Sequence, residues 1–466
     1  MNFVRFILFG FSFVTLQVFG VQKQETNNLK PRVIVLTDVS TWETDDSESL
    51  VRLLVHADLI EIEGIIYTTG WSHEILRDDF IDLIHGAITA YEKDLSNLIK
   101  RSVSSDVTQD ETRQQIGYWP SPDYLRKRTV FGSKQRGIDK IGKDNVSDGS
   151  NLIIALADEN DERPLWILLW GGGNTLAQAI WQVQQDRSEE ELLAFLHKIP
   201  TYAITDQDRS YKKGTPYKLS AHQWLRKEFE KDLMFLWDEC AWKYQNGKGR
   251  DTWSEYEKHI QSHGNLGKEY PKYKYGVEGD TPAFLHLLPN GLNNPMEPEQ
   301  VGWGGYFQFG LSADDTTNAF TNHKGKANEI CMKYQDYFYP ATFNNFVARM
   351  DWADNGKGNR NPIIVLNGSN GIKPIRIVKK PGEMVNLDAS ESYDPDNNQL
   401  HFKWWILSEA GTYQKKPTIP DNKLNKITIQ IPGDSAGTNF HVICEVNDNG
   451  EPNLTSYRRI IIHSKN

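Results

Sequence analysis

The sequence predicts an α/β protein with an open, mostly parallel sheet, followed by a smaller β-sandwich. Two observations predict this fold class. From residue 31, short β-branched runs alternate with longer amphipathic stretches, as expected of a parallel sheet with helices on both faces. Beyond residue 372, apolar side chains recur at every second position, which indicates antiparallel strands with one buried face.

The first twenty residues have the pattern of an export signal. One early basic residue, Arg5, precedes a long Phe-rich apolar run that ends in the small residue Gly20. We therefore expect a signal peptide over residues 1–20 and a secreted or periplasmic protein, with an uncleaved membrane anchor as the alternative. No later segment is apolar enough to span a bilayer, so we expect no membrane contact after cleavage.

The alternating part of the chain predicts four strands, each followed by or close to a helix. The strands are expected at 33–38, 62–69, 165–170 and 201–205, and the helices at 47–56, 75–94, 151–157 and 175–185. Residues 209–275 are basic, aromatic and irregular, and we expect helices and long loops there. A fifth strand is expected at 273–277, before a Gly-, Pro- and Asn-rich loop whose aromatic residues favour an ordered conformation.

The composition changes near residue 355, where DNGKGNRNP is typical of a linker. Strict alternation follows at Leu400, Phe402, Trp404 and Ile406, at Ile427, Ile429 and Ile431, and at Val442, Cys444 and Val446. We therefore predict one domain over residues 31–352 and a β-sandwich over residues 372–466.

Composition excludes some partners and favours another. The net charge of −10 argues against binding to nucleic acid or to anionic membranes. The three cysteines are widely separated and odd in number, so they predict neither a metal site nor a disulfide framework. Fourteen Trp and nineteen Tyr are typical either of a sugar-binding protein or of large aromatic cores.

Polar or Gly-rich residues follow four of the predicted strands, and in parallel sheets ligands bind beyond these carboxyl ends. The four segments are Thr37-Asp38, Thr68-Thr69-Gly70-Trp71, Gly171-Gly172-Gly173-Asn174 and Thr205-Asp206-Gln207-Asp208. Their convergence on one edge of the sheet predicts a binding site there.

Carboxylates are concentrated in VIVLTDVSTWETDDSESL, residues 33–50, just where the first strand is expected to end. They are Asp38, Glu43, Asp45, Asp46 and Glu48. Ca²⁺ takes six to eight oxygen ligands, several of them carboxylates, so a bound cation would explain the cluster. Alternatively, Asp45 or Asp46 caps the following helix, whose N-terminus favours negative charge.

The chain resembles a secreted family described as nucleoside-hydrolase-like and cellulose-binding. The matching stretches are SLVRLLVHADLIEIEGIIYTTGWS, RPLWILLWGGGNTLAQAI, YAITDQD, GNLGKEYP, VEGDTPAFLHLLPNGLNNP, GWGGYF and FVARMDW. The C-terminal stretch DASESYDPDNNQLHFKWWILSEAGTY resembles the immunoglobulin-like domain of that family. The resemblance implies a nucleoside-hydrolase-like fold with an immunoglobulin-like β-sandwich.

In nucleoside hydrolases an N-terminal Asp-x-Asp-x-x-x-Asp-Asp motif binds Ca²⁺. By resemblance Asp38 matches its second Asp, and Asp45 and Asp46 match its final pair. The resemblance also implies metal ligands at Asn174, where the family uses a backbone carbonyl, and at Asp280. This chain departs from the motif, because Leu36 replaces the first Asp and six residues separate Asp38 from Asp45.

The resemblance implies metal-assisted hydrolysis at an anomeric carbon, with Asp38 as the general base. The expected substrate-binding residues are Trp42, Trp71, Asn174, Asp206, Asp208, Glu278 and Trp303. His73, His222 and His286 are candidate acids for the leaving group. Because the chain has an export signal, we predict hydrolysis of plant or algal polysaccharide fragments. The alternatives are a non-catalytic glycan-binding protein and, less favoured, an N-ribosyl hydrolase.

Overall fold

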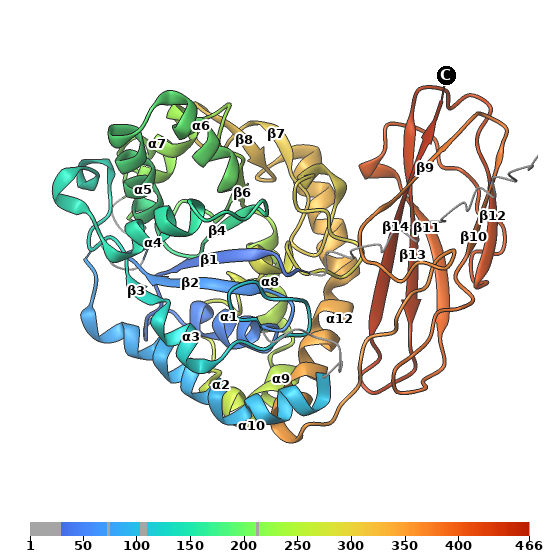
Figure 1. Cartoon of the computed structure of the whole chain (residues 1–466), viewed down its shortest axis with the longest axis horizontal. Helices are drawn as coiled ribbons and strands as arrows, with labels where there is room; N and C mark the ends of the chain where they lie inside the picture. Colours follow the sequence, from blue (N-terminus) through green and yellow to red (C-terminus); the bar gives the residue numbers. More distant parts are fainter. Residues whose placement is uncertain (1–28, 72–74, 103–109, 211–213, 466) are drawn as a thin grey trace, which may run out of the picture.

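The computed structural model describes residues 29–71, 75–102, 110–210 and 214–465. The predicted signal peptide, residues 1–20, and His73 lie outside the described residues. In the described part a large α/β body lies beside a smaller, strand-rich one (Figure 1). No described helix is long and apolar enough to cross a membrane.

The α/β body is built on an eight-stranded sheet in the order β3-β2-β1-β4-β5-β6-β8-β7. The strands are β1 (Arg32–Thr37), β2 (Glu61–Tyr67), β3 (Thr129–Phe131), β4 (Leu165–Leu169), β5 (Thr201–Ile204), β6 (Phe235–Asp238), β7 (Gln308–Leu311) and β8 (Asn318–Thr321). All neighbouring pairs are parallel except β7 with β8. The predicted fold class is therefore confirmed.

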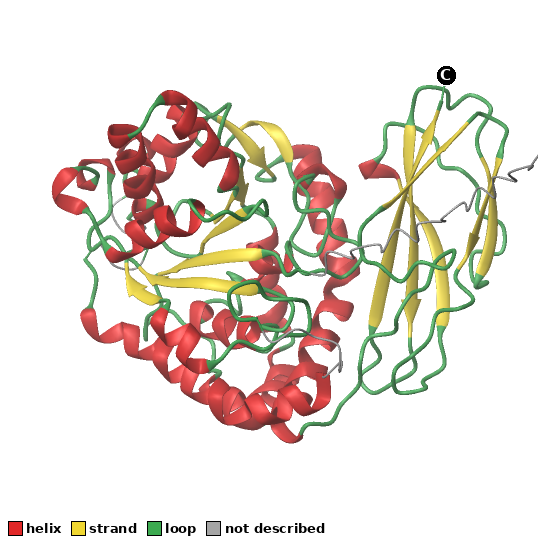
Figure 2. Ribbon diagram, in the orientation of Figure 1, coloured by secondary structure: helices red, strands yellow, loops and turns green. Residues whose placement is uncertain are grey.

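Helices cover both faces of this sheet (Figure 2). They are α1 (Asp45–Leu54), α2 (Ile81–Ser102), α3 (Pro122–Lys127), α4 (Asp148–Ala157), α5 (Asn174–Asp186), α6 (Glu189–Lys198), α7 (Ala221–Glu228), α8 (Ala241–Asp251), α9 (Trp253–Tyr256), α10 (Gly264–Glu269), α11 (Thr281–Leu285) and α12 (Gly325–Asn355).

Strand β1 shows why the sheet must be covered twice. Val33 and Val35 contribute to an apolar core that α1, α2, α11 and α12 also line, whereas Ile34 and Leu36 contribute to a second core lined by α4 to α7. Successive side chains of a strand point to opposite faces, so an uninterrupted apolar run places one face in each core.

The predicted strands agree with β1, β2, β4 and β5 to within two residues at each end. The prediction of a fifth strand at 273–277 is wrong. Only an isolated bridge between Lys274 and Gly276 forms there, and Tyr275 between them has φ 73°. A residue in this left-handed conformation cannot continue an extended strand. Strand β6 instead lies within the region predicted to be irregular.

The C-terminal body consists of a four-stranded sheet, β11-β13-β14-β9, and a two-stranded sheet, β10-β12. The strands are β9 (Ile375–Lys379), β10 (Met384–Asp388), β11 (His401–Leu407), β12 (Lys426–Gln430), β13 (Asn439–Asn447) and β14 (Thr455–Ser464). The predicted alternating residues face one shared core. The expectation of antiparallel pairing holds except for β9, which pairs with β14 in parallel.

The segment predicted to be a linker, residues 354–362, is packed. Helix α12 ends at Asn355, and Gly356 follows in the left-handed conformation with φ 68°. Beyond it, the Asn359 amide donates to Asp448 Oδ2 at 2.8 Å, and the Arg360 guanidinium donates to Asp396 Oδ1 at 2.8 Å. The chain is thus tied to the sandwich as soon as it leaves the helix.

The sandwich also packs on the long loop that contains Trp303. The buried Arg459 of β14 donates from Nε to the Leu292 carbonyl at 2.7 Å and from Nη2 to the Val301 carbonyl at 2.8 Å. A Cβ at Gly291 would lie 1.9 Å from the Tyr457 carbonyl oxygen, so only glycine allows this approach. The loop is therefore ordered, as its aromatic residues predicted.

Candidate functional site

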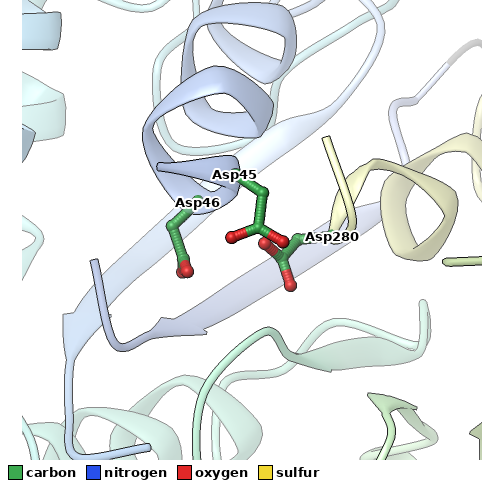
Figure 3. Close-up of side chains that lie close together, drawn as sticks. All are labelled: Asp45, Asp46 and Asp280. Atoms are coloured by element: carbon green, nitrogen blue, oxygen red, sulfur yellow. The ribbon is translucent and has the colours of Figure 1, made fainter. Parts of the chain in front are cut away.

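Three carboxylates from two distant parts of the chain meet at the carboxyl edge of the sheet. Asp45 and Asp46 open helix α1, and Asp280 immediately precedes α11. One oxygen from each lies within 4.8 Å of the others, and Figure 3 shows the Asp45 and Asp280 carboxylates pointing toward one another. We call this group the acidic centre. The structure therefore brings together three of the five predicted metal ligands.

Helix capping does not explain the acidic centre. The residue that caps α1 is Thr44, and its side chain makes no capping hydrogen bond. Asp46 instead accepts a short hydrogen bond from the Thr37 hydroxyl at the end of β1. Burial raises the pKa of Asp46 to about 7, and the nearby Glu43 carboxylate adds to this effect.

Asp280 is the least satisfied carboxylate of the acidic centre. Its side chain is only 2% exposed, and its Oδ2 has no hydrogen-bond partner among the described residues. Burial raises its pKa well above the usual range, and so do the charges of Asp46, Asp45 and Asp38. A buried carboxylate oxygen without a donor is costly unless a proton or a cation neutralises it.

Asp38 lies next to the acidic centre but outside its 4.8 Å grouping. A Cβ at Gly70 would come within 1.8 Å of Asp38 Oδ2, and one at Gly171 within 3.0 Å of Oδ1. The carboxylate therefore fills space that these two strand-end glycines leave open. Burial raises the pKa of Asp38, and the charge of Asp46 raises it further.

The residues between Asp38 and Asp45 form a compact loop. The Ser40 hydroxyl accepts from the Glu43 backbone N–H at 3.1 Å. Trp42 is half-buried, with its ring 4.9 Å from Phe80 and beside the Arg77 guanidinium. The Trp42 ring therefore already packs against neighbouring side chains, and its role in sugar binding stays a prediction.

Glu48, which was not predicted as a site residue, links this loop to the segment before Asp280. It accepts from the Thr44 hydroxyl at 3.0 Å and from the Glu278 backbone N–H at 2.8 Å. Glu278 itself, a predicted substrate ligand, is fully buried and paired with Arg52 at 2.5 Å. Its carboxylate supports the fold under the site and is not exposed to a substrate.

The Asn174 side chain is held by the Gly137 backbone. Its Oδ1 accepts from the Gly137 N–H at 2.9 Å, and its Nδ2 donates to the Gly137 carbonyl at 2.8 Å. Both ends of the buried amide are thus used, which corrects the expectation that this side chain binds substrate. Asn246 on α8 takes a different position, with a buried Oδ1 that has no hydrogen-bond partner among the described residues.

Asp206 and Asp208 form a second group of carboxylates, separate from the acidic centre. Asp208 Oδ1 accepts from the Gly173 N–H at 2.9 Å, and its Oδ2 accepts from the His222 N–H at 2.8 Å. Asp206 accepts from the Ser220 hydroxyl at 2.8 Å. Both predicted substrate ligands are buried and hold the starts of α5 and α7 in place.

The other predicted aromatic and acid residues are partly or fully enclosed. Trp303 is 3% exposed and meets Tyr457 of the sandwich edge-on, so the expectation of an exposed sugar platform there is wrong. Trp71 is half-buried against Trp242. His222 and His286 are buried in aromatic surroundings, and burial lowers the pKa of His286 to about 4.

Comparison with known proteins places the chain in a family. Residues 32–307 match the family model described as cellulose-binding Sde182, nucleoside hydrolase-like domain, and residues 384–464 match the cellulose-binding protein Sde0182 C-terminal domain. No curated protein matches.

Among solved structures, a nucleoside hydrolase-related hypothetical protein from Saccharophagus degradans, associated with carbohydrate metabolism, is 35% identical. The match covers 94% of this chain and all of that chain, with a TM-score of 0.80. The effector protein XOO4466 is 10% identical over 71% of this chain and 94% of its own, and its TM-score of 0.33 is too low to support inference. The chain therefore belongs to the cellulose-binding Sde182 family, with a nucleoside hydrolase-like domain and the C-terminal domain of that family.

Proposed function

We propose that this protein is exported, binds a cellulose-like polysaccharide and hydrolyses glycosidic bonds in plant or algal glycan fragments at a Ca²⁺-dependent site. The observation that carries the proposal is the acidic centre, in which Asp45, Asp46 and Asp280 converge and one buried oxygen has no donor in the part of the chain that the structure describes. The cellulose-binding character for which the matching family is named supports the choice of substrate class.

The residues of the acidic centre suit a calcium ion. All are hard carboxylate oxygens, which Ca²⁺ prefers, and none is a sulfur or imidazole ligand that would favour zinc or copper. When bound, the ion would supply positive charge that polarises a water molecule and sugar hydroxyls. Asp38, beside the centre at the end of β1, is proposed to take the proton from the attacking water.

A second candidate is a glycan-binding protein without hydrolytic activity. It is favoured by the enclosure of Asp38, which is 4% exposed and lies tightly against Gly70. A third candidate, N-ribosyl hydrolysis, is least supported. Leu36 replaces the first Asp of the nucleoside hydrolase motif, and its side chain lies in the apolar core.

Reducing-sugar release from a panel of soluble β-glucans separates these candidates. We expect release by the wild-type protein with Ca²⁺, and loss of release with chelator or in Asp38→Asn. Retention on cellulose without any release would support the binding protein instead. Release of purine base from nucleosides would support the third candidate.

A protein that neither binds nor cleaves any glucan would contradict the proposal. Cell fractionation tests export separately.

A further inference from the structure

Tyr275 combines two features that are rarely found together. Its side chain is 77% exposed, the largest exposed fraction among the large apolar and aromatic side chains that the structure describes. Its φ is 73°, in the left-handed region that side chains with a Cβ seldom adopt. Exposure of an aromatic ring gains nothing for folding, and strained backbone is concentrated at functional sites.

The neighbouring backbone is held firmly on both sides of Tyr275. The Lys274 N–H donates to Thr44 Oγ1 at 2.8 Å, and Lys274 Nζ donates to the Thr41 carbonyl at 2.5 Å. The Tyr275 carbonyl accepts from Arg250 Nη1 at 3.0 Å. The ring is therefore presented from a fixed position, with little ordering needed when a ligand binds.

The same segment reaches the acidic centre only five residues later. Asn246 fits beneath it, because a Cβ at Gly276 would lie 2.3 Å from the Asn246 side chain and one at Gly279 would lie 2.9 Å from its Oδ1. A Cβ at Gly279 would also lie 2.5 Å from Asp45 Oδ2. The two glycines thus allow one rigid segment to carry both the exposed ring and Asp280.

A hollow of about 250 Å³ lies against the same segment. Leu50, Leu83, Ala87 and Pro271 form an apolar part of its lining, and Thr41, Thr44, Lys272 and Lys274 add hydroxyl and ammonium groups. The Thr44 hydroxyl already donates to Glu48, but the Thr41 hydroxyl and the two lysine ammonium groups can donate hydrogen bonds to sugar hydroxyls. An aromatic ring attracts the slightly positive C–H face of a pyranose. The segment therefore offers both kinds of contact that a sugar ring needs.

We propose that Tyr275 is the stacking platform of a sugar subsite beside the acidic centre. The subsite takes one pyranose ring of a β-linked glucan, with the adjoining hollow receiving its hydroxyls. This inference rests on the proposed function, because it assumes that the chain binds a cellulose-like glycan. It assigns the contact to the α/β body and not to the C-terminal sandwich.

Affinity electrophoresis in native gels with hydroxyethyl cellulose tests the subsite. We expect Tyr275→Ala to weaken binding roughly tenfold, and Tyr275→Phe, which keeps the ring, to bind like the wild type. Tyr393→Ala is the matched control, since Tyr393 is 51% exposed on the C-terminal side of the chain. It should leave binding unchanged.

Melting temperatures, measured on each variant, show whether folding is retained. If Tyr275→Ala is unstable, Tyr275→Gly removes the ring while easing the left-handed backbone, and it should also bind weakly. Unchanged binding by a folded ring-less variant overturns the subsite. If only Tyr393→Ala weakens glycan binding, the Tyr275 subsite is also overturned, and the glycan contact lies on the sandwich. If the wild type is not retarded at all, the proposed function fails instead.

Discussion

The acidic centre and the Asp206–Asp208 pair lie at the same edge of the same sheet, yet Asp280 and Asp208 differ sharply in their hydrogen-bond donors. Asp208 accepts from two backbone N–H groups, and Asp206 accepts from a serine hydroxyl. In the acidic centre, Asp280 Oδ2 has no donor among the described residues. Asp208, with a donor to each oxygen, holds the fold together, whereas the unpartnered oxygen of Asp280 leaves room for a proton or a cation. All of these residues are aspartates at the same edge of the sheet. The hydrogen-bond donors that other segments supply therefore decide which carboxylate oxygens are satisfied.

Aromatic side chains show the same contrast. Trp303 and Tyr275 both lie in Gly-containing loops that follow helices or turns, but Trp303 is 3% exposed and Tyr275 is 77% exposed. The sandwich packs on the loop of Trp303, while Tyr275 has no such cover. Position in a loop therefore does not distinguish a packing residue from a binding residue.

Replacing Trp303 with Ala should have the largest effect on stability. Its removal leaves a cavity between the long loop and β14, and buried Trp→Ala changes cost about 3–5 kcal/mol. Urea denaturation should show this loss for Trp303→Ala and little change for Tyr275→Ala. A stable Trp303→Ala protein with weakened glycan binding would reverse the assignment of the two side chains.

Asp280→Asn should abolish the response to Ca²⁺. A ligand present at a hundredfold excess over its Kd stabilises the folded state by about 2.7 kcal/mol. The wild type should therefore lose stability with chelator and regain it with Ca²⁺, whereas Asp280→Asn should respond to neither. Thermal denaturation and elemental analysis of the purified proteins provide the measurement. A wild-type protein that holds no cation and ignores chelator would contradict a metal site.

Much of the fold could be predicted because it depends on local patterns. Strands β1 and β4 have continuous apolar runs, β2 and β5 are rich in β-branched or aromatic residues, and all four are buried throughout. The sandwich residues that alternate strictly share one core. Strand β6 was not predicted, because it has only four residues and lies between basic and aromatic segments. The false strand at 273–277 has a suitable composition, but its backbone turns at Tyr275. The Gly276 N–H donates back to the Lys274 carbonyl at 3.0 Å, and the Lys274 N–H donates to Thr44 Oγ1.

The site was predicted in part for a similar reason. Asp45 and Asp46 follow directly from the strand-to-helix pattern, and Asp280 was placed by resemblance. The Asn174 side chain was expected to bind substrate, but it bonds to Gly137, which lies on a loop whose position no local pattern indicates. Its expected metal contact through the backbone carbonyl stays a prediction. Nothing in the sequence around Asn246 predicts a role at the site, because the residue lies inside α8. Its side chain lies close to the segment before Asp280 only because Gly276 and Gly279 have no Cβ.

Asp208→Ala separates structural carboxylates from ligands. The change leaves the N–H groups of Gly173 and His222 without an acceptor, and each buried unsatisfied donor costs about 1–3 kcal/mol. We expect lower stability with an unchanged gain on adding Ca²⁺, measured by chemical denaturation at fixed pH. If the Ca²⁺ response also disappears, Asp208 affects cation binding at the acidic centre, and the assignment of separate roles to the two groups of aspartates is wrong.

The smallest effect concerns the pH dependence that Asp206 gives to stability. Burial and, to a lesser degree, the charge of Asp208 raise its folded-state pKa to about 7, against the opposing charge of Arg226. Ser220 bonds the same carboxyl group, and His222 Nδ1 lies 3.9 Å away. A carboxyl pKa that is raised on folding favours the folded state at low pH, and this contribution is lost as pH rises through about 7.

Asp206→Asn removes this titration while keeping the oxygen that accepts from Ser220. The variant should be less stable than the wild type at pH 5, and the difference should narrow by on the order of 1 kcal/mol by pH 8, since one pKa unit corresponds to about 1.4 kcal/mol and Asp208 takes up part of the change. Urea denaturation of both proteins at the two pH values measures this difference, and groups common to both cancel. A difference that stays constant, or widens toward pH 8, would mean that Asp206 is already charged in the folded protein, and that its donors satisfy it fully without a proton.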